Sequence, residues 1–119
     1  LFRAEQSLAH EKTKSPHRTW FKALDSMCKK IEKIDFDIAL IGAGAYGLFL
    51  GGHCKKMGKS AIHVGGALQL FFGIKGKRWT EKTSPDHIPE KVWRSGWVWP
   101  LPSEVPLGAQ AVENGCYWK

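Results

Sequence analysis

The stretch Asp35–Trp79, DFDIALIGAGAYGLFLGGHCKKMGKSAIHVGGALQLFFGIKGKRW, decides the fold. An apolar run at 36–41 leads into the G-x-G-x-x-G of 42–47, and a helix-like segment extends over 46–57. A second apolar run follows at 61–64. Strand, glycine turn, helix and strand is the order of a βαβ unit. The stretch therefore predicts an α/β fold built on a partial Rossmann-like βαβ unit with parallel strands.

The packing of this unit can be predicted from the same residues. The first strand is almost continuously apolar, which is typical of a strand buried on both faces. Small residues in the helix let a helix and a sheet approach each other closely. We therefore expect the helix to contact the sheet through Leu48, Phe49, Gly51 and Gly52. Residues 67–72 are predicted to form a short helix.

An amphipathic helix is predicted before the first strand. Ser15 has the character of an N-cap, and Pro16 suits the first helical position. A charged face with four lysines lies opposite an apolar stripe at helical spacing. The stripe consists of Trp20, Leu24, Met27, Ile31 and Ile34. We expect this helix to cover one face of the sheet, with residues 1–14 as a lead-in and 15–79 as one domain.

The chain changes character after Trp79. Five of its six prolines and five of its six tryptophans lie from Trp79 onward. Proline at this density prevents a long helix, and tryptophan at this density does not suit a free linker. Residues 80–119 are therefore predicted to form an extended, Trp/Pro-rich C-terminal strap on a protein surface.

Two parallel strands are too few for a stable sheet, because both edges remain open and little apolar area is buried. We expect a missing N-terminal half or another protein chain to complete the sheet. The chain is then incomplete as a folding unit, and a larger complex is one way to complete it.

Composition limits the partners and the compartment. The net charge of +7 favours phosphate, nucleic acid or an acidic surface, without choosing among them. The three cysteines have no metal-ligand spacing, so no metal site is predicted and an intracellular location is favoured, in the cytoplasm or an organelle interior. The longest uncharged run, 38–52, is shorter than the roughly 18 residues of a membrane span, so none is expected.

The glycine turn is the strongest candidate for binding chemistry. Gly42 permits the tight turn, Gly44 lets the backbone approach a phosphate, and Gly47 permits close helix packing. An NAD site also needs an acidic residue about 20 positions further on. No Asp or Glu occurs between Asp37 and Glu81, so NAD is disfavoured. A glycine turn that serves packing alone is the alternative to anion binding.

Two further groups of residues follow the second strand. His63 and Gly65-Gly66 lie where open α/β sheets place ligands, although His63 could equally be a packed histidine. Lys75, Lys77 and Arg78 form a basic cluster next to two glycines. Such a cluster can clamp a diphosphate or bind RNA, or it can be a solvated loop or a contact to a partner. Nucleic acid is supported only by charge and aromatic content, and is the third of three hypotheses.

A resemblance adds to this interpretation. The runs IGAGAYG, GGALQL…FGIKGKRW and GCYW, the last at 115–118, resemble the C-terminal part of a family of largely uncharacterised bacterial proteins. More distantly, the unit is similar to the second half of GT-D-type glycosyltransferases. The resemblance implies a nucleotide-sugar ligand, and it adds Tyr46 and Gln69, which lie within the shared runs, to the candidate binding residues.

The same resemblance limits catalysis. Those enzymes have an acidic, metal-associated motif in their N-terminal half, and no R-x-G-D-G-E-like motif occurs in these 119 residues. We therefore expect the C-terminal portion of a glycosyltransferase-like, nucleotide-sugar-binding protein that is not catalytic alone. The alternative is a non-catalytic structural subunit of a larger assembly. Sugar and acceptor are not determined by the sequence.

Overall fold

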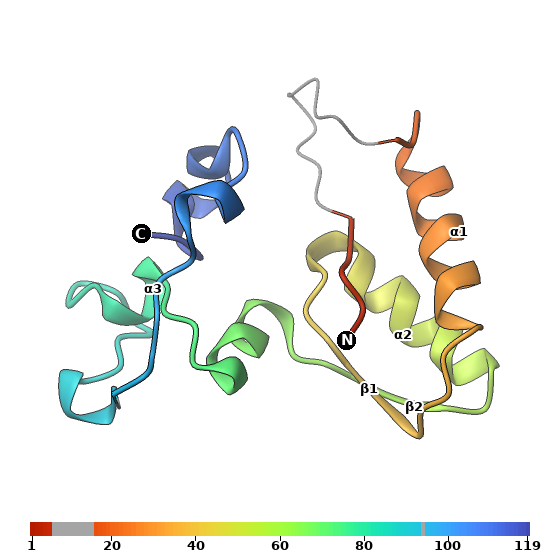
Figure 1. Cartoon of the computed structure of the whole chain (residues 1–119), viewed down its shortest axis with the longest axis horizontal. Helices are drawn as coiled ribbons and strands as arrows, with labels where there is room; N and C mark the ends of the chain where they lie inside the picture. Colours follow the sequence, from red (N-terminus) through yellow and green to blue (C-terminus); the bar gives the residue numbers. More distant parts are fainter. Residues whose placement is uncertain (6–15, 94) are drawn as a thin grey trace. The chain divides into compact units, whose positions relative to one another are not determined.

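A computed structural model describes residues 1–5, 16–93 and 95–119 of the chain (Figure 1). The contacts divide the chain into two compact units, Leu1–Leu68 and Gln69–Lys119. The sequence places the boundary later, after Trp79. Within the described ranges, no helix is long and apolar enough to cross a membrane.

The first unit contains the predicted parallel strands. Strand β1 (Ile38–Ile41) pairs in parallel with β2 (Ser60–His63), and helix α2 (Gly47–Lys56) lies between them in the chain. The register places Ile41 opposite His63, so both strands end at the same edge of the sheet. A mixed α/β architecture is therefore confirmed. The two strands form the whole sheet within the described residues.

Helix α1 (Trp20–Ile31) lies beside α2 (Figure 1). At one end the Trp20 ring stacks on Tyr46, with centroids 4.9 Å apart. At the other end His53 Nε2 lies 3.2 Å from a carboxylate oxygen of Glu32. The two helices therefore run in the same direction. Their shared core is built from buried side chains of both helices and the sheet: Ala23, Met27, Ile31, Ile41, Tyr46, Leu50 and Cys54.

One face of the sheet is exposed, which corrects the prediction of a strand buried on both faces. Side chains alternate along a strand, so Ile41 points to the core while Ile38 and Leu40 point to the opposite face. Ile38, Leu40 and Ile62 are each about half exposed, at 51%, 50% and 51%. The run is apolar on both faces, but the helices cover only one of them.

The ends and faces of the helices also differ from expectation. Helix α1 begins at Trp20 rather than near Pro16, because Thr19 is the N-cap and its Oγ1 accepts from Lys22 N at 3.2 Å. The helix ends before Ile34. Ser15, predicted as N-cap, and most of the 1–14 lead-in lie outside the described residues.

The residues of α2 that face the core are not the ones predicted from the sequence. Leu50 and Cys54 are buried, whereas Leu48 and Phe49 are 73% and 55% exposed. Gly51 does face the sheet, because its Cβ position lies 3.9 Å from Ala61 Cβ. Gly52 has nothing within 4 Å of its Cβ position. Helix geometry places Leu50 and Cys54 on one face at an i, i+4 spacing, and this pair rather than Leu48 and Phe49 meets the core.

The second unit consists of short turns and one short helix. Helix α3 covers Lys77–Thr80, and Ile74 forms a parallel bridge with Val98. The second unit also contains four single-turn 3₁₀ elements within the described residues: η3 (Glu90–Val92), η4 (Pro102–Glu104), η5 (Ala109–Ala111) and η6 (Glu113–Gly115). The 3₁₀ element η2 (Gly65–Phe72) begins in the first unit and ends in the second. Trp79 is buried, and Trp93 packs edge-on against Trp97 with centroids 5.0 Å apart. Trp79 is thus the buried tryptophan of this unit, while Trp93 and Trp97 form a partly buried pair.

The open sheet face yields a matched pair of substitutions. Leu50→Ala removes a side chain that is 2% exposed, and should lower the free energy of unfolding by about 2 to 5 kcal/mol. Leu40→Ala removes the same atoms from a half-exposed position, and should cost less than about 1 kcal/mol. Urea unfolding followed by circular dichroism measures both values. An equally large loss for Leu40→Ala would mean that the sheet face is covered.

Candidate functional site

The glycine turn joins β1 to α2 at the carboxyl edge of the sheet. A Cβ on Gly42 would lie 2.7 Å from the carbonyl oxygen of Gly65 and 2.9 Å from Leu68 Cβ, so only glycine fits. Gly44 has a φ of +49° and nothing within 4 Å of its Cβ position. The turn is therefore closed on the side of Gly65 and open at Gly44.

Backbone donors collect at this edge. A 3₁₀ turn (η1, Gly44–Tyr46) precedes α2, and η2 begins at Gly65 directly after β2. The first N–H groups of a helical element have no partner within that element. Gly44 and Ala45 supply such groups after β1, and Gly65 and Gly66 supply them after β2. Because a Cβ on Gly42 would touch the carbonyl oxygen of Gly65, the two turns lie next to each other at this edge. Free N–H groups at the start of a helical element attract an anion.

His63 lies at the same edge. It ends β2, and a Cβ on Gly47 would overlap the imidazole ring. Gly47 is therefore a packing glycine, and it sets the distance between the start of α2 and the end of β2. His63 itself is exposed, and its Nε2 side lies against Gly47 at the start of α2.

Tyr46 belongs to the core rather than to the open side of the turn. Its side chain is buried, its ring stacks on Trp20, and its hydroxyl has no hydrogen-bond partner in the described part of the chain. The structure thus brings six of the predicted site residues together at one edge, with Tyr46 packed beneath them. The six are Gly42, Gly44, Gly47, His63, Gly65 and Gly66.

The remaining predicted residues lie in the second unit. The Gln69 side-chain amide donates to the carbonyl oxygens of Lys75 at 2.9 Å and Tyr117 at 3.2 Å, and weakly to that of Ile74 at 3.5 Å. The backbone N–H of Lys75 donates to Val98 O at 2.7 Å. These bonds join the 69–75 segment to the C-terminal residues. Gln69 is therefore engaged in holding the backbone of this unit.

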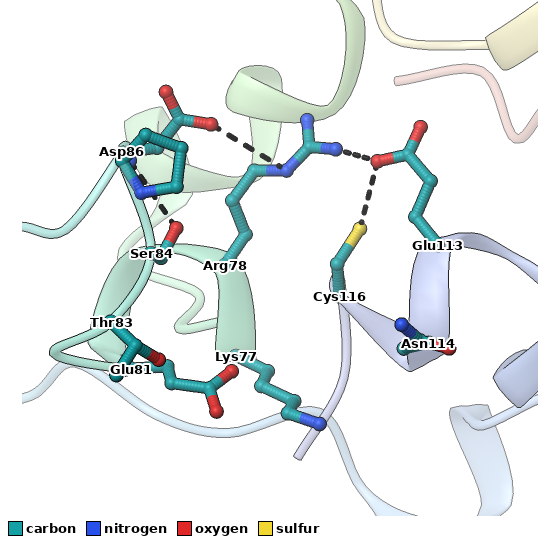
Figure 2. Close-up of a pocket in the computed structure, with 10 residues that line it drawn as sticks. Lys77, Arg78, Glu81, Thr83, Ser84, Asp86, Glu113, Asn114 and Cys116 are labelled. Carbon is teal, nitrogen blue, oxygen red and sulfur yellow. Dashed lines mark hydrogen bonds and ion pairs between the residues drawn. The ribbon is translucent and has the colours of Figure 1, made fainter.

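Arg78 is neutralised by carboxylates. Its guanidinium pairs with Glu113 and lies 3.8 Å from Asp86 (Figure 2). It also covers the Tyr117 ring at 5.0 Å from the centroid. Its backbone N–H donates to Cys116 O, and that of Lys77 donates to Trp118 O. The helix start that could have held a phosphate is thus occupied by the GCYW segment. Arg78 attaches the C-terminus to α3.

A cavity of about 410 Å³ lies beside Arg78 (Figure 2). Its lining includes Lys77 and Arg78, but also Glu81, Asp86 and Glu113. Cys116 Sγ lies 3.4 Å from the Glu113 carboxylate. Because carboxylates outnumber cations here, the cavity does not suit a diphosphate. Sequence reasoning missed Asp86 and Glu113, since no spacing connects them to Arg78.

The cysteines form no disulfide and no described metal cluster. All three are free, and no group of three or more His, Cys, Asp or Glu side chains in the described residues could hold a metal ion. Burial raises the pKa of both the Cys28 and the Cys54 thiols, with a smaller contribution from Asp25 at Cys28. Both thiols are therefore protonated at neutral pH and pack as apolar groups.

Comparisons with known proteins give no relative. No protein family, curated protein or solved structure matches this chain. The resemblance to glycosyltransferases therefore remains an expectation, and function is argued from the two units themselves.

Gln69 supplies a test of its structural role. Gln69→Leu keeps the shape but leaves the carbonyls of Lys75 and Tyr117 without their donor, which should lower the free energy of unfolding by about 1 to 3 kcal/mol. Gln110→Leu is the control, because Gln110 is an exposed glutamine of the same unit that makes none of these bonds; its side chain lies against Gly115, and its replacement should cost less than that of Gln69. Urea unfolding monitored by tryptophan fluorescence compares the two. Unchanged stability together with weakened ligand binding would instead identify Gln69 as a binding residue.

Proposed function

We propose that the chain is the C-terminal part of a glycosyltransferase-like protein, whose Rossmann-like βαβ unit binds the diphosphate of a nucleotide sugar at the carboxyl edge of β1 and β2. The observation that carries the proposal is the close approach of Gly42 to the carbonyl oxygen of Gly65, which brings the turn after β1 and the turn after β2 together at one edge of the sheet. Backbone N–H groups at this position of an α/β sheet bind phosphate in many folds.

Charge supports an anionic ligand at this edge. No carboxylate occurs from Ile38 to Thr80, so nothing on these elements repels a diphosphate. Asp35 and Asp37 precede β1 and therefore lie at the opposite end of the strand. His63 adds a side-chain donor, and the open space at Gly44 admits the ligand. In an NAD site, an acidic residue at the end of the second strand accepts a hydrogen bond from a ribose hydroxyl. No acidic residue follows β2 here before Glu81, and this favours a nucleotide sugar over NAD.

Catalysis is not assigned to this chain alone. The described residues lack a carboxylate cluster that would hold a catalytic metal ion. In the proposal, this chain supplies the phosphate-binding edge, and an N-terminal half or a partner chain supplies the acidic, metal-binding part.

A second candidate is a non-catalytic subunit of a larger assembly. The half-exposed Ile38, Leu40 and Ile62 favour it, because a two-stranded sheet with an apolar open face is completed by further strands or by another layer. In this hypothesis the glycine turn serves packing alone, and the chain binds no nucleotide.

A pair of glycine substitutions separates the two candidates. Gly44→Ala adds a methyl group on the open side of the turn, and should weaken binding of UDP or pyrophosphate roughly tenfold. Gly58→Ala is the matched control, because Gly58 also has a positive φ, of +75°, and open space, but follows the far end of α2. Isothermal titration of the folded chain measures both. Equal affinities for the two variants, or no binding by the parent chain, would favour the structural subunit.

A further inference from the structure

An exposed aromatic patch lies where α1 and α2 begin. Trp20 links it, since its ring packs edge-on against Phe21 at 5.2 Å and against Phe49 at 5.1 Å. Phe21 is 76% exposed, and Leu48, next to Phe49, is 73% exposed. We call Trp20, Phe21, Leu48 and Phe49 the aromatic patch. It differs from the open sheet face, whose side chains are only half exposed and lie across the sheet from the helices.

Cations border the patch. Arg18 and Lys22 flank Phe21 in the sequence, are exposed, and have no ion pair within the described residues. Among the described residues, Asp25 lies four residues after Phe21 on α1 and pairs with Lys29 at 2.7 Å, and Glu5 lies 3.7 Å from His17. In the described part of the chain, the unpaired charges beside the protruding apolar side chains are therefore those of Arg18 and Lys22.

This combination identifies the partner by its chemistry. Aromatic and leucine side chains that protrude from one end of a structure enter the boundary between headgroups and acyl chains, where tryptophan is also favoured. Lysine and arginine at the same level are attracted to anionic headgroups. We propose that the aromatic patch docks the first unit on the surface of an anionic lipid bilayer, without a membrane span. The inference does not depend on nucleotide binding.

The flanking cations favour a bilayer over a protein surface. A protein interface usually has few charged residues in its centre and a mixed polar rim. Here Lys22 on α1 and Arg18 before it are positive, and Asp25, four residues after Phe21, is paired with Lys29. Phe21, Leu48 and Phe49 protrude at 55 to 76% exposure. Protruding groups suit a fluid layer that deforms around them, and a border with more positive than negative charges suits a surface that is uniformly negative.

Vesicle sedimentation of the complete chain tests the proposal. The chain should sediment with phosphatidylcholine vesicles that contain about 30% phosphatidylserine, and less with phosphatidylcholine alone. Phe21→Ser with Phe49→Ser should weaken that binding by roughly tenfold or more. Arg18→Gln with Lys22→Gln should weaken binding to the anionic vesicles by roughly fivefold for each cation removed.

The matched control is Ile38→Ser with Ile62→Ser, which removes two large apolar side chains from the sheet face. It should leave vesicle binding unchanged, as should Gly44→Ala, so loss of nucleotide binding and loss of membrane binding are distinguishable. Circular dichroism verifies that each variant is folded. The proposal is overturned if the parent chain does not bind anionic vesicles, or if the Phe21→Ser, Phe49→Ser variant binds them as tightly as the parent. It is also overturned if the Ile38→Ser, Ile62→Ser variant loses as much vesicle affinity as the phenylalanine variant. A Phe variant that changes only the oligomeric state would identify a protein interface and also overturn it.

Discussion

Steric exclusion at two glycines determines the geometry of the first unit. A Cβ at Gly42 would contact the carbonyl of Gly65, and a Cβ at Gly47 would overlap the His63 ring. Both contacts join the turn after β1 to the end of β2. The start of α2 can therefore lie directly over the carboxyl edge of the sheet, with Leu50 and Cys54 directed into the core. The placement of backbone donors at this edge follows from the same two contacts.

Charge is arranged differently in the two units. At the carboxyl edge of β1 and β2, the glycine edge, the elements themselves carry no carboxylate, because no Asp or Glu occurs from Ile38 to Thr80. In the second unit, the positive charge of the basic segment Lys75–Arg78 is partly neutralised, because Arg78 pairs with Glu113 and Asp86. The carbonyl groups of Cys116 and Trp118 also accept from the backbone N–H groups at the start of α3. A net charge of +7 alone would favour the basic segment as the binding site. The contacts favour the glycine edge instead.

Local signals predicted the βαβ order, the glycine turn and the parallel strands, because each depends on residues close together in the sequence. The burial of β1 could not be predicted, since an apolar run such as Ile38–Ile41 does not say whether a second layer exists. The face of α2 was also mistaken: Leu48 and Phe49 look like core residues, but helix geometry gives that role to Leu50 and Cys54. Pairing of Arg78 with Glu113 joins residues far apart in the chain, and no periodicity encodes it. Phosphate binding, completion of the sheet by another part and the glycosyltransferase-like role stay predictions.

The central claim is that the carboxyl edge of β1 and β2 binds phosphate through its backbone. Amide chemical shifts recorded by NMR during a titration with UDP test it most directly. The account predicts that the amides of Gly44, Ala45, Gly65 and Gly66 shift together with one dissociation constant, while those of Lys77 and Arg78 stay unchanged. Shifts centred on Lys77 and Arg78, or none at the glycine edge, would contradict it.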